Sequence, residues 1–253
     1  MKITIVIPTY NELENLPKIV SAVFELPLPE LKVLVVDDDS PDGTGKLADE
    51  LVKQYPSRLS VLHREGKLGL GTAYIRGFEK ALADGAEYIV QMDADFSHPP
   101  EKIVEFAETI KHCDVVIGSR YVRGGELDKN WPFWRKALSW FGNYYARFIL
   151  NASVLDVTGG FRFWRRDTLL GIPLDRVRSN GYAFQIEMIY IAHRLGYQSK
   201  EVPIYFAERD LGKSKMSIKI QIEAAYRVWQ MRNSYQDLHP IVHQKEEAHS
   251  ASL

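Results

Sequence analysis

Two aspartates one residue apart, Asp93 and Asp95, are the residues of this chain best suited to chemistry. They follow residues 87–92, a short apolar run typical of a buried strand. Carboxylate oxygens are preferred ligands of hard divalent cations, and such a cation can hold a diphosphate. Asp-x-Asp also arises by chance in turns, so the pair gains meaning only if other strand ends carry similar groups.

Two earlier predicted strands also end in polar residues. The first, residues 3–7, leads into Pro8-Thr9-Tyr10-Asn11-Glu12. The second, residues 33–36, leads into Asp37-Asp38-Asp39-Ser40-Pro41-Asp42-Gly43-Thr44. Ligands of α/β proteins bind at the carboxyl ends of the strands, so the three ends predict one polar edge. The stretch 40–43 also reads as a turn and helix cap, which would itself position Asp38.

Strands and helices alternate through the first half of the chain. Predicted strands cover residues 3–7, 33–36, 59–62, 89–92 and 115–117, with helical patterns between them. This alternation predicts an α/β fold with a mostly parallel sheet flanked by helices. The second half is mixed, with strands expected at 159–164 and 202–207 and helices at 183–195 and 217–230.

Composition and the lack of certain sequence signals argue against several classes of protein. The formal net charge of -1 gives no reason to expect nucleic acid as a partner. The single cysteine, Cys113, excludes an internal disulfide and favours a reducing compartment. The first residues resemble a strand rather than a signal peptide, and no apolar run approaches the roughly 18 residues of a membrane span. No complete dinucleotide-binding or P-loop motif is present.

Five motifs, in this order, resemble the large inverting GT-A glycosyltransferase family 2. They are Pro8-Thr9-Tyr10-Asn11-Glu12, Asp37 to Thr44, Asp93-Ala94-Asp95, Gly118-Ser119-Arg120-Tyr121 and Gly212-Lys213-Ser214-Lys215-Met216. Within that family the chain is most similar to polyprenol-phosphate (dolichol-phosphate) mannose synthases, over roughly residues 3 to 230. The resemblance implies one GT-A catalytic domain over residues 1–236. Its nucleotide-sugar-binding half would span 1–125 and its acceptor half 126–236, and we expect a disordered tail at 237–253.

The resemblance also implies substrates and residue roles. It implies a GDP-mannose donor, an Mg²⁺ or Mn²⁺ ion and a polyprenyl (dolichyl) phosphate acceptor. The residues it places around the guanosine are Pro8, Tyr10, Glu12, Val36 and Asp38. Those it places at the diphosphate and metal are Asp93, Ala94 and Asp95. Those it places at the donor or acceptor phosphates are Arg120, Arg209 and Lys215, with Arg135 and Ser139 at the acceptor phosphate.

One position departs from the family pattern. The family usually has a metal-ligating glutamine two residues after the second aspartate, where this chain has Ser97. A serine hydroxyl is shorter, so Ser97 would coordinate through a water or not at all. The preferred metal therefore stays open.

The aromatic and basic stretch 131–150 has helical spacing. One face carries Trp134, Leu138, Phe141, Tyr145 and Phe148. Another carries Arg135 and Ser139, which suits a phosphate clamp. Exposed aromatics beside basic residues suit a membrane interface, whereas an ordinary helix packed on the core explains the same pattern. We expect a cytoplasmic protein at the periphery of the membrane's cytoplasmic face, held by this stretch or by a separate membrane-anchoring protein.

Two other functions remain open at this stage. One is the same chemistry with another donor such as UDP-glucose, and the other is a non-catalytic module that binds a nucleotide sugar. An ionised acceptor phosphate needs no general base, since its second pKa is about 6. Glu187 is the best candidate if a carboxylate takes part, although a structural role or contact with the sugar is preferred. The histidines, His98 included, are expected to be structural or surface groups.

Overall fold

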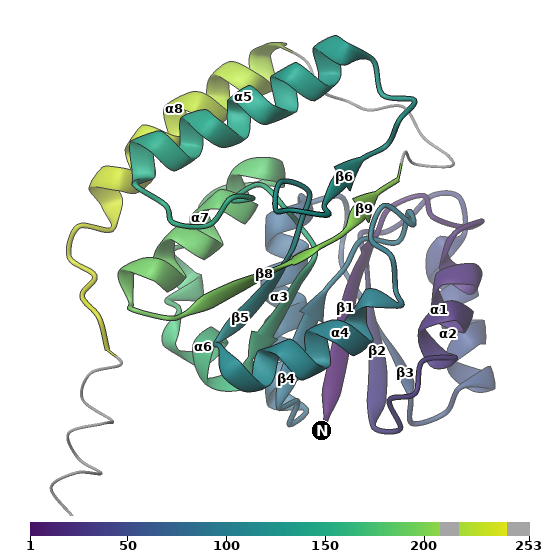
Figure 1. The fold of residues 1–253 in the computed structure, drawn as a ribbon. Coiled ribbons are helices and arrows are strands. Elements are labelled where there is room, and N and C mark those ends of the chain that lie inside the picture. Colours follow the sequence, from purple (N-terminus) through teal and green to yellow (C-terminus); the bar gives the residue numbers. More distant parts are fainter. Residues whose placement is uncertain (208–217, 242–253) are drawn as a thin grey trace, which may run out of the picture.

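The computed structural model describes residues 1–207 and 218–241. Within these residues seven strands form one sheet in the order β3-β2-β1-β4-β7-β5-β8 (Figure 1). The strands are β1 (Ile3–Thr9), β2 (Leu31–Asp37), β3 (Leu59–His63), β4 (Tyr88–Gln91), β5 (Val115–Ser119), β7 (Arg162–Arg165) and β8 (Ser199–Pro203). All neighbouring strands are parallel except β7, which runs antiparallel to β4 and β5.

Helices cover both faces of this sheet and one end of the molecule. They are α1 (Leu16–Phe24), α2 (Thr44–Gln54), α3 (Leu70–Ala83), α4 (Lys102–Thr109), α5 (Phe133–Leu150), α6 (Arg166–Gly171), α7 (Gly181–Arg194) and α8 (Ile218–Ser234), with short 3-10 helices at Ile110–His112 and Leu174–Arg176. Side chains alternate between the faces of a strand, so β1 sends Val6 into the core shared with α3 and α7, and Ile5 and Ile7 into the core shared with α1 and α4. The predicted α/β class with a mostly parallel sheet is confirmed.

The sequence did not predict the position of the antiparallel strand β7 in the sheet. The sequence indicated a strand at 159–164 but gave no sign that it would enter the sheet between β4 and β5. The predicted strand 202–207 divides in two: β8 ends at Pro203, just past which the Ile204 N–H still donates to the Ser119 carbonyl of β5 at 3.0 Å. Its second part, β9 (Tyr205–Phe206), pairs instead with β6 (Glu126–Leu127).

Helices α5 and α8 form a separate layer at one end of the molecule. Figure 1 shows them side by side at the end opposite the N-terminus, which is the end toward which β1 runs. The Tyr145 hydroxyl donates to the Ala225 carbonyl at 3.3 Å, and Arg232 donates to the Ile149 carbonyl at 3.3 Å. The layer therefore lies on the side of the sheet where the strand ends carry their polar residues.

Part of the predicted tail is in contact with the domain. Asp237 forms an ion pair with Arg176 at 2.7 Å, and the Ile241 N–H donates to the Leu195 carbonyl at 2.9 Å. Residues 242–253 lie outside the described residues, as do Arg209 and Lys215 of the predicted basic loop. The assignment of one catalytic domain over 1–236, with a 1–125 and a 126–236 half, stays a prediction.

Candidate functional site

The three polar strand ends meet at one edge, as the sequence predicted. β1 lies between β2 and β4 and is parallel to both, so the loops that follow these strands are neighbours. The Asp38 N–H donates to the Thr9 carbonyl at 3.0 Å, which ties the first two loops together. Each loop contains one residue other than glycine with left-handed backbone: Asn11 (φ 62°), Asp39 (φ 55°) and Phe96 (φ 59°). Such residues are uncommon and cluster at functional sites.

The loop after β2 is built around two aspartates with different tasks. Asp37 accepts from the Thr9 hydroxyl at 2.9 Å and from the Ser40 hydroxyl at 2.7 Å, which fixes the turn. Asp38 is buried and forms an ion pair with Arg64 at 2.6 Å. Burial raises the pKa of Asp38, although Arg64 opposes the shift. The turn thus positions Asp38 at the strand edge, where its other carboxylate oxygen accepts from the Leu68 N–H at 3.2 Å.

The other residues predicted around the nucleoside lie on the same edge. The Lys67 ammonium sits 3.7 Å from the centre of the Tyr10 ring. Glu12 accepts from the Asn15 amide at 2.8 Å, and Pro8 pairs in register with Val36. The Val36 side chain is fully buried in the core, so this residue would meet a ligand through its backbone.

The paired aspartates after β4 are held by different partners. Tyr74 donates its hydroxyl proton to Asp93 at 2.6 Å. Burial, together with the Asp93 charge, raises the pKa of Tyr74 well above its ordinary value, so the hydroxyl stays protonated. Asp95 is buried and accepts from the Ser97 hydroxyl at 2.5 Å and from the Ser97 N–H at 3.1 Å. Ala94, between the two acids, packs in the core.

The donor atoms at this turn fit a hard divalent cation. Among the described residues no group of three or more His, Cys, Asp or Glu side chains could hold a metal ion by itself. Magnesium sites that act on phosphates commonly use one or two carboxylates and take their other ligands from water and the substrate. Asp93 and Asp95 supply such carboxylates, and Ser97 is already bonded to Asp95.

Arg120 lies at the end of β5 in a buried ion pair. Its Nε and Nη2 donate to the two oxygens of Asp156 at 2.8 and 2.7 Å, and Nη2 also donates to Thr158 at 2.6 Å. Burial by itself would raise the pKa of Asp156, but the Arg120 charge and its hydrogen bonds lower it. Two parallel hydrogen bonds between guanidinium and carboxylate fix the Arg120 side chain firmly.

Aromatic rings connect Arg120 to the predicted acceptor clamp. The Arg120 guanidinium lies 5.2 Å from the centre of the Phe206 ring, and Trp131 meets Phe206 edge-on at 5.9 Å. The Arg135 guanidinium lies 3.7 Å from the centre of the Trp131 ring. On the Asp93 side, His98 contacts Phe206 at 5.9 Å. Phe206 thus joins the acidic turn, Arg120 and Arg135 in one region.

The start of α5 is also joined to this region by a hydrogen bond. The Ser139 and Tyr121 hydroxyls are 2.8 Å apart, and Tyr121 directly follows Arg120. Ser139 and Arg135 are one helical turn apart on α5. The structure therefore brings together Arg120, Arg135 and Ser139, which the resemblance assigned to phosphate binding.

Most aromatic side chains of α5 are exposed, which argues against the reading of this face as one packed on the core. Phe133 is 86% exposed, Phe148 73%, Trp134 66% and Phe141 58%. The residues of α5 that pack on the core are instead Asn143, Ala146, Ile149 and Leu150. An exposed apolar surface on this scale typically marks an interaction site. In the described part of the chain no helix is both long and apolar enough to cross a membrane.

Glu187, the alternative catalytic carboxylate, has structural contacts. It is buried and accepts from the Ser179 N–H at 2.8 Å, the Arg178 N–H at 3.2 Å and the Tyr235 hydroxyl at 2.7 Å. These bonds connect α7 to the segment before it and to the end of α8. The preferred structural role of Glu187 agrees with this geometry.

Sequence reasoning did not find three partners of the site residues. They are Arg64, Tyr74 and Asp156. His98 was named, as a structural group, and it accepts from the Asp93 N–H at 3.0 Å while stacking on Phe161. Arg64 directly follows β3, so a search of the strand ends for basic as well as acidic residues would have found it. Asp156 lies 36 residues from Arg120, and only the fold brings the two together.

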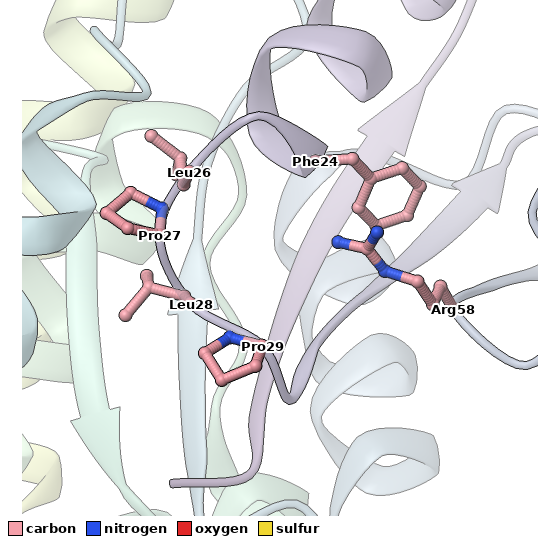
Figure 2. A pocket seen from close by; sticks show the side chains of 6 residues that line it. All are labelled: Phe24, Leu26, Pro27, Leu28, Pro29 and Arg58. Atoms are coloured by element: carbon pink, nitrogen blue, oxygen red, sulfur yellow. The ribbon is translucent and has the colours of Figure 1, made fainter.

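A separate cavity of about 400 Å³ lies away from this site. Figure 2 shows its lining, which consists of Phe24, Leu26, Pro27, Leu28, Pro29 and Arg58. This segment joins α1 to the amino end of β2, whereas the acidic groups follow its carboxyl end. The cavity is therefore not part of the candidate site.

The chain belongs to glycosyl transferase family 2, because the sequence model of that family matches residues 4–170. It is 48% identical over 228 residues to the undecaprenyl-phosphate mannosyltransferase of Micrococcus luteus, covering 90% of this chain and 93% of the relative. It is likewise 48% identical over 231 residues to the polyprenol monophosphomannose synthase of Mycolicibacterium smegmatis, covering 90% and 86%. These findings confirm the predicted family.

Solved structures support the fold class. Glucosyl-3-phosphoglycerate synthase from Mycobacterium tuberculosis, in complex with Mn²⁺, UDP and glucosyl-3-phosphoglycerate, superimposes with a TM-score of 0.63 at 18% sequence identity. The match covers 92% of this chain and 79% of that one. At this level of identity the likeness concerns the fold alone.

Proposed function

We propose that this protein transfers mannose from GDP-mannose to a polyprenyl (dolichyl) phosphate, forming β-mannosyl phosphoryl polyprenol. The observation that carries the proposal is the 48% identity, over 90% of the chain, to two proteins named for transfer of mannose to polyprenyl phosphates. The site supports it, since acids and hydrogen-bond acceptors gather on one side and Arg120, Arg135 and Ser139 on the other. Such an arrangement suits two phosphorylated substrates.

The proposed mechanism needs positioning and charge neutralisation more than proton transfer. A phosphate monoester is largely ionised at neutral pH, so the acceptor oxygen can attack the sugar C1 without a base. Glu187 is engaged in three structural hydrogen bonds, which favours a mechanism without it. Arg120 and Arg135 would hold the acceptor phosphate in line with C1, and one displacement would invert the anomeric centre.

We propose Mg²⁺ or Mn²⁺ as the cofactor. Asp93 and Asp95 would hold the ion together with oxygens of the donor diphosphate, and Ser97 would orient Asp95 through their hydrogen bond. When bound, the ion neutralises charge that develops on the leaving diphosphate. Tyr74 and His98 fix the Asp93 side chain and backbone and so would orient this carboxylate toward the ion.

The substrate assay tests this proposal directly. Purified protein with Mn²⁺ is expected to release GDP from GDP-mannose only when polyprenyl phosphate is present. UDP-glucose in the same assay tests the alternative donor, and its preferential use would refute the GDP-mannose proposal. No turnover with either donor and either metal would favour a non-catalytic module.

Arg135 should act on the acceptor and not on the donor. Arg135→Ala is expected to lower kcat/KM for polyprenyl phosphate by about tenfold to a hundredfold, because a charge-assisted contact contributes roughly 1.5–3 kcal/mol. Arg135→Lys should restore part of the loss, since an ammonium lacks the guanidinium fork. Acceptor kinetics, calorimetric binding of GDP-mannose and melting temperatures would be measured together.

Lys136→Ala is the matched control for the clamp. Lys136 is the next residue on α5 and donates to the Lys129 carbonyl at 3.2 Å. Lys136→Ala therefore removes a positive charge from the same helix while the contact between Arg135 and Trp131 stays in place. Equal losses of donor and acceptor use in Arg135→Ala, accompanied by a lower melting temperature, would contradict an acceptor clamp. They would indicate that stacking of Arg135 on Trp131 is structural.

We propose that the α5–α8 layer rests on the cytoplasmic face of a membrane, where the lipid acceptor lies. Aromatic side chains are exposed on α5, which carries Arg135, and on α8, where Tyr226 is 63% and Trp229 46% exposed. Replacing Phe133, Trp134 and Phe141 with serine should weaken sedimentation with anionic vesicles at least tenfold, because each buried aromatic contributes roughly 1.5–3 kcal/mol. Leu170→Ser on α6, at a site as exposed as Phe141 (58%), should have no effect. Unchanged sedimentation of the triple variant would instead favour a separate anchoring protein.

A further inference from the structure

Strand β7 carries a fully buried arginine, Arg162, between two strands that lead to the site. Arg162 pairs in register with Gln91 of β4 on one side and with Ile117 of β5 on the other. Asp93 comes two residues after Gln91, and Arg120 comes three residues after Ile117. Arg162 therefore lies between the strand that leads to the acidic pair and the strand that leads to Arg120.

Hydrogen bonds satisfy this guanidinium only in part. Nη2 donates to the Val157 carbonyl at 3.0 Å, whereas Nε and Nη1 have no hydrogen-bond partner within the described residues. The side chain is 0% exposed. Burying unsatisfied donors on a charged group is unfavourable, and replacing such groups by apolar residues is often neutral or stabilising. Stability alone therefore does not explain an arginine at this position.

Groups on both sides of the site lie close to Arg162. Burial lowers the pKa of Arg162 to about 9, while the Asp156 charge favours its charged form; Tyr74, which stays protonated, lies near it as a neutral hydroxyl. The guanidinium is thus cationic at neutral pH. Tyr74 is the group that donates to Asp93, and Asp156 is the partner of Arg120. The two neighbours of Arg162 are therefore the groups that hold the two halves of the site.

We propose that Arg162 is a positioning residue whose buried positive charge supports both phosphate-binding halves of the site through Tyr74–Asp93 and Asp156–Arg120. The charge attracts the two substrate phosphates from the interior of the sheet. Fixed charges in a dry interior act strongly because little water screens them. This role rests on the proposed transfer between two phosphorylated substrates.

The test separates activity from stability. Arg162→Met removes the charge but keeps much of the side-chain length. We expect an unchanged or higher melting temperature together with roughly tenfold lower kcat/KM for both GDP-mannose and polyprenyl phosphate, in contrast to the acceptor-specific effect of Arg135→Ala. Arg162→Lys keeps a charge and should restore part of the activity.

Arg165→Met is the matched control on the same strand. Arg165 donates to the carbonyls of Ile110, Lys111 and Cys113 at the other end of β7, and all of these bonds stabilise the fold. This variant should melt at a lower temperature and keep its kcat/KM per folded molecule. Unchanged kcat/KM in Arg162→Met, a lower melting temperature or failure of that variant to fold would each overturn the proposal.

A titration of His193 provides a measurement that needs no substrate. Burial, together with the charge of Arg162, lowers the pKa of His193 to about 4. In Arg162→Met this pKa, followed by NMR, should rise, and no rise would overturn the proposal. If the wild-type protein transfers no mannose, the proposed function fails. The melting temperature and the His193 titration then still decide whether Arg162 is a buried charge that lowers the stability of the fold.

Discussion

Replacing Asp95 with alanine is expected to abolish mannosyl transfer, and EDTA should do the same until Mg²⁺ or Mn²⁺ is returned. Asp95 is buried at the turn after β4 and offers a carboxylate to the proposed ion. Losing stabilisation of the leaving diphosphate should raise the barrier by several kcal/mol, which lowers the rate on the order of 10³-fold or more. Initial rates of GDP release with saturating substrates would measure this.

Asp84→Ala controls for the loss of one acidic charge. Asp84 is exposed at the end of α3 and, within residues 1–207 and 218–241, pairs only with Lys80, at 2.6 Å, so its removal should leave the rate unchanged. Full activity of the wild-type protein in chelator would refute metal dependence. Ser97→Gln provides a second measurement. If the side chain at position 97 can reach the ion, this variant should need a lower metal concentration to reach its half-maximal rate.

Replacing Asp156 with alanine should have the largest effect on stability. The change leaves Arg120 buried without its partner, and breaking a buried ion pair in this way typically lowers the free energy of unfolding by about 3–5 kcal/mol. For a protein of this size the melting temperature should fall by roughly 6–20 °C. Calorimetry or thermal unfolding followed by circular dichroism would measure the shift.

The pH dependence of this loss is a further check. The folded pKa of Asp156 is below its ordinary value of 3.8, so the contribution of the pair is fully present above that value. It is lost as the pH falls through the folded pKa, and the wild-type and Asp156→Ala proteins should then approach equal stability. Asp84→Ala, which breaks an exposed pair, should change stability by less than about 1 kcal/mol. A loss in Asp156→Ala no larger than in Asp84→Ala would contradict the importance of the buried pair.

The local pattern of the chain was enough to predict most of the sheet and its polar edge. Apolar runs such as residues 33–36 mark buried parallel strands because both faces of such a strand are covered. The acids at 37–39 and at 93 and 95 follow those runs directly. Strand, turn and acid are contiguous in sequence, and parallel pairing brings successive carboxyl ends to one edge, so this part of the site needed no knowledge of tertiary contacts.

Tertiary structure alone decided which charges are paired and which aromatic face is exposed. Arg120 pairs with Asp156, 36 residues away in sequence. Arg162 lies between β4 and β5 because the antiparallel strand β7, which carries it, inserts between these two strands. The spacing of α5 fixed which residues share a face, but the same periodicity suits a helix on the core and a helix on a membrane. Only the packing of α5 through Ala146 and Ile149 left Trp134 and Phe148 in solvent. Periodicity defines a face, whereas the neighbours that cover it are set by the whole fold.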